Sequence, residues 1–160
     1  MQSILGLLGF LAACFVAAST GAICRPGHWY DNLAKPSWQP PKRIFPIAWT
    51  ILYIMIAISG WLIWRKVGFA GGAIPLLIYG VQLILNAGWS VLFFGLKRPD
   101  LALIEVVLLW LSILATIVAF HPVDVDAALL LVPYFLWVSF ASFLNLTICR
   151  LNGGFPTLAG

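Results

Sequence analysis

The chain alternates between long apolar segments and short polar ones, and five of the apolar runs are long enough to cross a bilayer. About 20 apolar residues span the hydrocarbon core as an α-helix, and runs that are continuous rather than alternating exclude a β-barrel. The pattern predicts an all-α membrane protein, a five-transmembrane-helix bundle that forms one domain over residues 1–160. The predicted helices cover residues 4–24, 44–64, 72–96, 101–120 and 127–149.

The longest polar break joins the first two predicted helices and reads RPGHWYDNLAKPSWQPPKR, residues 25–43. Its prolines prevent a regular helix, and Trp29, Tyr30 and Trp38 are bulky for a solvated linker. One interpretation is an aromatic belt at the membrane interface. The other is a stiff lid over the mouth of the bundle, which the proline density favours because a rigid loop loses less entropy on closing.

Composition and charge support a lipid environment. Apolar residues make up 62% of the chain and charged residues 9%, against about 25% charged in typical soluble domains. The cations lie at the ends of the apolar runs rather than on one folded face, so we expect no nucleic-acid partner. Seven of the nine Lys and Arg residues fall on the side that holds the C-terminus. This bias predicts a cytoplasmic C-terminus and an outside N-terminus in a bacterial inner membrane.

Small residues recur along the third predicted helix at spacings that place them near one face. Such residues mark close helix approaches in membranes. They predict a seam with another helix of the chain, or the contact of a symmetric homodimer. The residues are Ala73, Gly80, Ala87, Gly88 and Gly95.

A second stripe lies on the opposite side of the same helix. Gln82, Asn86, Trp89 and Phe93 fall within an arc of ~60° at 100° per residue. Burying two amides in hydrocarbon is unfavourable unless they are paired. We therefore expect this stripe to face the bundle interior or a cavity.

Similar stripes occur in two other predicted helices. Helix packing explains any one stripe alone, but three stripes beneath an aromatic loop favour a pocket for a flat, largely apolar ligand. The residues are Trp49 and Tyr53 in the second helix, and Tyr134, Trp137, Ala141 and Asn145 in the fifth.

Ionisable and catalytic groups are sparse within the predicted spans. Glu105 is the one acid inside a span, and proton-coupled transporters usually need more intramembrane charge. The sequence contains no recognisable nucleophile–His–carboxylate set and no metal-ligand spacing. We expect no metal site, no required cofactor and no conventional enzyme chemistry.

Four ordered segments, WYDNLAKPSWQPP, FPIAWTILY, NAGWSVLFFGLKR and PYFLWVSFASFLN, carry a family resemblance. The chain resembles the tryptophan-rich sensory protein and translocator protein family, also called the peripheral-type benzodiazepine receptor family, over about residues 21–152. The resemblance implies a five-helix bundle that is often dimeric. It implies porphyrin ligands such as protoporphyrin IX, and cholesterol for the eukaryotic members.

By motif position, the resemblance implies a ligand pocket and a role in sensing, regulating or transporting a porphyrin-like ligand. The alternatives are slow light-dependent porphyrin degradation that uses Trp49 and Trp137, or the binding of a sterol or lipid-like ligand. Leu146 stands where the sterol motif has Tyr, which disfavours sterol. The implied pocket residues are Trp38, Pro40, Trp49, Tyr53, Asn86, Trp89, Phe93, Trp137, Ala141 and Asn145.

Overall fold

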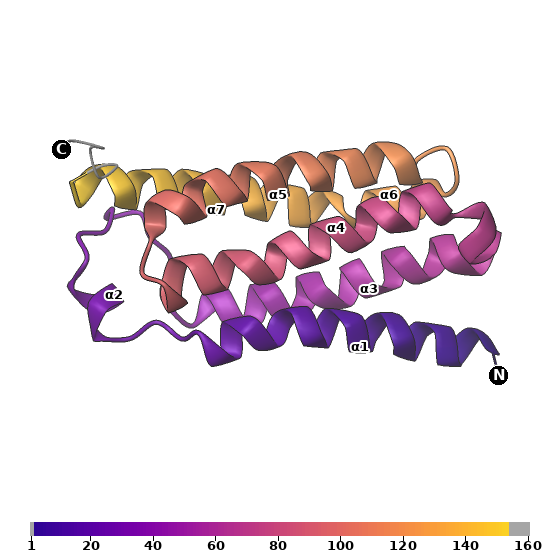
Figure 1. Ribbon diagram of the computed structural model, residues 1–160, viewed down its shortest axis with the longest axis horizontal. Helices are drawn as coiled ribbons and strands as arrows, with labels where there is room; N and C mark the ends of the chain where they lie inside the picture. Colours follow the sequence, from indigo (N-terminus) through magenta and orange to yellow (C-terminus); the bar gives the residue numbers. More distant parts are fainter. Residues whose placement is uncertain (1, 154–160) are drawn as a thin grey trace.

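The computed structural model describes residues 2–153 and contains five helices long and apolar enough to span a membrane. The prediction of a five-helix membrane protein is confirmed. The helices run along the long axis of the molecule, and no strand occurs among residues 2–153 (Figure 1). The spans are α1 (Gln2–Ile23), α3 (Ile44–Gly71), α4 (Ala73–Ser90) with the π-helical turn η1 (Val91–Gly95), α5 (Pro99–Phe120), and α6 (Val125–Leu130) followed by α7 (Val132–Leu151).

The helices pack pairwise, α1 against α3, α4 against α5, and α5 against α7. One close approach lies at Gly60 of α3, where an added Cβ would come within 2.7 Å of the Tyr79 ring and 2.9 Å of the Phe10 ring. Tyr79 stacks on Phe120 and donates a hydrogen bond to the Ile56 carbonyl at 3.1 Å. The absence of a side chain at position 60 therefore lets three helices meet around one buried tyrosine.

The second span is longer than predicted. The helix continues through Arg65 and Lys66, and its first departure from helical geometry is Gly68, at φ +67°. Arg65 lies over the Trp61 ring at 4.4 Å, and Lys66 forms an ion pair with Asp124 at 3.3 Å. The predicted end at Trp64 was early because these long side chains extend away from the span while their backbone remains helical.

The fifth span is two helices rather than one. α6 ends at Leu130, Leu131 forms a turn, and α7 begins with Pro133 in its first turn. Proline has no backbone N–H to donate, so it is well placed at a helix start and breaks a helix interior. Asp124 caps α6 by accepting a hydrogen bond from the Ala127 amide at 3.0 Å.

The small residues of the third span do not share one environment. A Cβ added at Gly80 would meet nothing within 4 Å, and Ala73 is exposed. Ala87 packs against the core, Gly88 lies near a Glu105 carboxylate oxygen, and Gly95 lies near the Cys24 sulfur. The predicted seam thus divides into an outward part and a part that contacts α1 and α5.

The loop before α3 contains a short helix, α2 (His28–Asn32), which the proline pattern did not predict. Asn152 at the end of α7 holds this loop by accepting a hydrogen bond from the Ala34 amide and donating one to the Ala34 carbonyl, at 2.9 and 2.8 Å. The loop therefore lies across the end of the bundle that also carries the end of α7 (Figure 1).

Candidate functional site

A cavity of about 1110 Å³ lies between the helices in the half of the bundle nearest α2. It is lined by residues of α1, α3, α4, η1, α5 and α7 and of the loop that follows α1. Small-molecule pockets are typically about 300–1,000 Å³ and mostly apolar. The cavity therefore has room for a large apolar ligand.

Eight of the predicted pocket residues line this one cavity, although they come from three separate spans. Their stripes converge because α3, α4 with η1, and α7 each turn an aromatic face to the same space. They are Trp49, Tyr53, Asn86, Trp89, Phe93, Trp137, Ala141 and Asn145.

A chain of hydrogen bonds runs from the cavity wall into the core. Tyr53 donates to the Asn86 side-chain oxygen, and Asn86 donates to the Tyr134 hydroxyl at 2.6 Å. Tyr134 in turn donates to the Gln82 side-chain oxygen at 3.0 Å. Gln82, Asn86 and Tyr134 are all buried, as the amide stripe predicts. The chain links α3, α4 and α7 and presents the Tyr53–Asn86 pair at the cavity surface.

The aromatic side chains of the wall pack against one another in pairs. Trp89 stacks on Phe93 with ring centroids 5.0 Å apart, and Trp49 lies 5.5 Å from Tyr53. Among the described residues, the indole nitrogens of Trp89 and Trp137 are buried without a hydrogen-bond partner. The wall therefore offers flat apolar surfaces, and its two unpaired indole N–H groups are enclosed by neighbouring atoms.

Asn145 also lies at the wall, but its amide serves the neighbouring helix. In the orientation that satisfies both neighbours, it donates to the Pro99 carbonyl and accepts from the Leu103 amide, each at 3.1 Å. Asn145 thus joins α7 to the first turn of α5, and its contribution to the site is chiefly to position that turn.

Three predicted site residues lie elsewhere. Tyr134 is fully buried behind the wall, where it supports Asn86. Trp38 packs edge-on against Phe140 and lines a shallow groove on the outer side of α7. Pro40 is half-buried in the loop and lines neither the cavity nor this groove.

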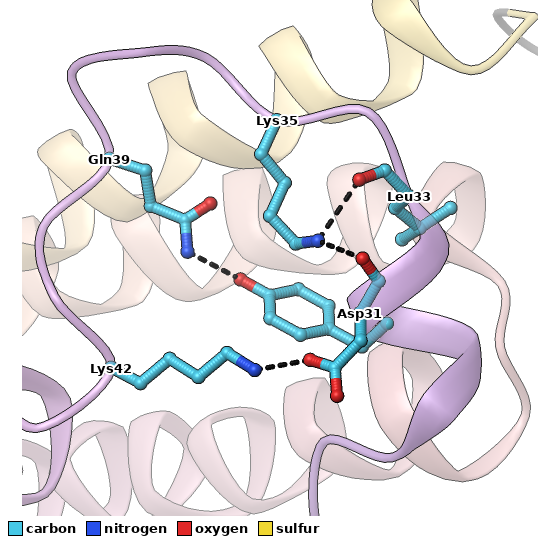
Figure 2. Close-up of polar contacts among 6 residues, drawn as sticks. Asp31, Leu33, Lys35, Gln39 and Lys42 are labelled. Atoms are coloured by element: carbon cyan, nitrogen blue, oxygen red, sulfur yellow. Dashed lines mark hydrogen bonds and ion pairs between the residues drawn. The ribbon is translucent and has the colours of Figure 1, made fainter.

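The loop near the cavity is held together by polar contacts (Figure 2). Gln39 donates to the Tyr30 hydroxyl at 3.1 Å, and Lys35 donates to the carbonyls of Asp31 and Leu33, each at 3.0 Å. Lys42 forms an ion pair with Asp31, whose carboxyl pKa it lowers, whereas burial raises the pKa of the Tyr30 hydroxyl. Asp31 is therefore ionised and Tyr30 neutral near pH 7.

Some lining residues were not predicted from the sequence. α1 contributes Leu11, Phe15 and Ala18, which carry no polar stripe that could have marked them. Arg25 and Lys42 line the cavity near the loop, whereas their positions in the sequence predict only the orientation in the membrane. Among the described residues, no group of three His, Cys, Asp or Glu side chains is arranged to hold a metal ion.

Comparison with known proteins identifies relatives over most of the chain. The family model described as the TspO/MBR family matches residues 7–151. The tryptophan-rich sensory protein of Cereibacter sphaeroides is 43% identical, covering 93% of this chain and 92% of the relative. Protein CrtK of Rhodobacter capsulatus is 44% identical, covering 91% of each. The translocator protein of Sus scrofa is 41% identical, covering 79% of this chain and 76% of the relative.

Proposed function

This chain belongs to the TspO/MBR family, and from that premise we propose that its cavity binds a tetrapyrrole such as protoporphyrin IX. Relatives are named as sensory and translocator proteins, which supports a sensing or transport role at the level of the family. The observation that carries the proposal is the cavity of about 1110 Å³ with tryptophans on three helices around it. A flat macrocycle suits such a wall because its faces stack on aromatic rings.

Apart from Arg25 and Lys42 at the loop end, the polar groups of the wall are few and neutral, which suits a mainly apolar ligand. Tyr53 and Asn86 are paired with each other at the cavity surface, whereas the indole N–H groups of Trp89 and Trp137 are unpaired but enclosed. In ligand pockets of this kind, a small number of polar groups fix the orientation of an apolar body. We assign this role to the Tyr53–Asn86 pair.

The test is a titration of the full chain in nanodiscs with protoporphyrin IX, followed by quenching of tryptophan fluorescence. Saturable quenching is expected for the wild type. Trp89→Ala should raise Kd about threefold to tenfold, because an aromatic contact contributes about 0.5–1.5 kcal/mol. The matched control is Trp61→Ala, since Trp61 bonds to the Ser3 carbonyl and does not line the cavity. Quenching that never saturates, or an equal response of both variants, would count against the proposal.

A second candidate function is light-dependent loss of the bound porphyrin. The observation that favours it is that Trp49 and Trp137, the two tryptophans assigned to this chemistry, both line the cavity. Illumination of the complex, with product analysis by chromatography, tests the idea. Unchanged loss in Trp49→Phe and Trp137→Phe variants that still bind porphyrin would rule out a role for these indoles.

We also propose an arrangement in the membrane and an assembly. The Lys and Arg bias supports a cytoplasmic C-terminus and an outside N-terminus. The open space at Gly80 supports a homodimer through α4. Crosslinking of Gly80→Cys tests the dimer, with Ile104→Cys on the exposed face of α5 as the control. Equal crosslinking of both variants, or none at Gly80, argues against a contact at α4.

A further inference from the structure

The charged side chains that line the cavity are both cations. Arg25 and Lys42 belong to the loop between α1 and α3, and the other lining side chains of the described chain are neutral. Neutral polar groups line the cavity from the helices, as Asn86 and Asn145 do, and from the loop, as Gln39 does. The cavity therefore combines an apolar body with one positively charged end.

Arg25 follows the end of α1 and is oriented by that helix. Its Nε donates a hydrogen bond to the Ala22 carbonyl at 2.7 Å, which satisfies one of the carbonyls left free at a helix end. No carboxylate among the described residues forms an ion pair with Arg25. Its terminal nitrogens remain available as paired donors, the geometry that suits a carboxylate.

Lys42 is already paired, but weakly. Its partner Asp31 is on α2, and both side chains are largely exposed, so the pair contributes little to stability (Figure 2). An ammonium group has three N–H donors, and Asp31 takes one of them. A second anion can therefore bind Lys42 without displacing Asp31, although Asp31 reduces the positive potential that such an anion meets.

Gln39 completes this end of the cavity. It lines the cavity, donates to Tyr30, and has a buried side-chain oxygen with no partner among the described residues. The bond to the Tyr30 hydroxyl holds the Gln39 side chain at this end of the cavity (Figure 2).

We propose that Arg25 and Lys42 form a subsite for the carboxylate groups of the ligand, and that Asp31 weakens it. The inference rests on the proposed function and narrows it to flat apolar molecules that carry carboxylates at one edge. The apolar body lies among the tryptophans and the anionic edge points to the loop. Neutral analogues of the same shape then bind more weakly.

The experiment compares protoporphyrin IX with its dimethyl ester, which has the same macrocycle without the negative charges. Both are titrated into the wild type and into Arg25→Gln, Lys42→Gln, the double variant and Asp31→Asn, in nanodiscs of zwitterionic lipid. The control is Arg65→Gln, because Arg65 lies over Trp61 near the opposite end of α3. All of these positions are exposed, so the variants should fold.

The wild type should bind the diacid about threefold to tenfold more tightly than the diester, the range expected for exposed charge pairs. The double variant should lose this preference while its Kd for the diester stays unchanged. Asp31→Asn should increase the preference, and added salt should reduce it. Arg65→Gln should match the wild type.

Two results would overturn the inference. One is a diacid-to-diester ratio that is the same in the double variant and the wild type. The other is a loss of the diacid preference in the double variant that occurs only when the titration is repeated in nanodiscs of anionic lipid. That result would assign Arg25 and Lys42 to lipid phosphates instead. If the wild type binds the diester saturably with no preference for the diacid, the carboxylate subsite is refuted and the proposed function stands. If neither probe binds saturably, the proposed function is refuted.

Discussion

Tyr134→Phe tests whether the buried hydrogen-bond chain stabilises the bundle around the cavity. The hydroxyl of Tyr134 accepts a hydrogen bond from Asn86 and donates one to Gln82, at 2.6 and 3.0 Å. Removing it leaves the Asn86 amide donor and the Gln82 oxygen without partners. Both side chains are buried, at 4% and 1% exposed, so water does not replace the lost bonds.

The size of the effect follows from these two groups. An orphaned buried polar group destabilises a protein by about 1–3 kcal/mol, but hydrogen bonds in membrane proteins average about 0.6 and reach about 1.7 kcal/mol. Two lost bonds therefore predict a destabilisation of about 1–3 kcal/mol. For a chain of this size, the midpoint of thermal unfolding should fall by about 3–10 °C.

The measurement is thermal unfolding in a fixed detergent, followed by tryptophan fluorescence. Ser142→Ala is the matched control on α7, because its hydroxyl bonds only to the Val138 carbonyl of its own helix. A Tyr134→Phe, Gln82→Leu double variant should be destabilised by less than the sum of the two single variants. Replacing both partners of one hydrogen bond leaves fewer buried polar groups without a partner. If Tyr134→Phe is no less stable than Ser142→Ala, the chain does not stabilise the bundle as we infer.

Three further predictions follow from the packing and the loop contacts, and the first two use the same unfolding measurement. Gly60→Ala should lower the free energy of unfolding by about 1–3 kcal/mol because its Cβ would overlap the Tyr79 ring. Gly80→Ala should be neutral or stabilising, because its Cβ would meet nothing within 4 Å and Ala favours a helix. The opposite order of stability would contradict the packing. The pKa of Asp124 is lowered by its hydrogen bond from the α6 backbone, so its stabilisation is present near neutral pH and is lost as the pH falls below about 4. The difference in unfolding midpoint between wild type and Asp124→Asn should therefore shrink on acidification. A constant difference would show that ionisation of the Asp124 carboxyl does not contribute to stability. Asn152→Ala should increase protease sensitivity in the loop before α3 with little change in the unfolding midpoint, and an unchanged cleavage rate would show that Asn152 does not hold the loop.

Much of the site could be predicted from helical periodicity because each stripe is local to one helix. Asn86, Trp89 and Phe93 share a face at spacings of three and four residues, and an amide on that face must avoid lipid. The family resemblance alone placed Trp38 and Pro40 in the pocket, and the structure places Trp38 on the outer side of α7 instead. A loop has no fixed period, so its side-chain directions could not be worked out in this way.

The sequence by itself determined that the chain spans a membrane as five helices, because transfer of apolar runs into hydrocarbon depends on composition and length. It also determined which faces of those helices carry amides and aromatic rings. Only the tertiary structure decided that Gly60 admits Tyr79, that Asn145 bonds to the first turn of α5, and that Arg25 and Lys42 line the cavity. These features depend on contacts between residues far apart in the chain, and the pattern within any one segment does not specify its neighbours.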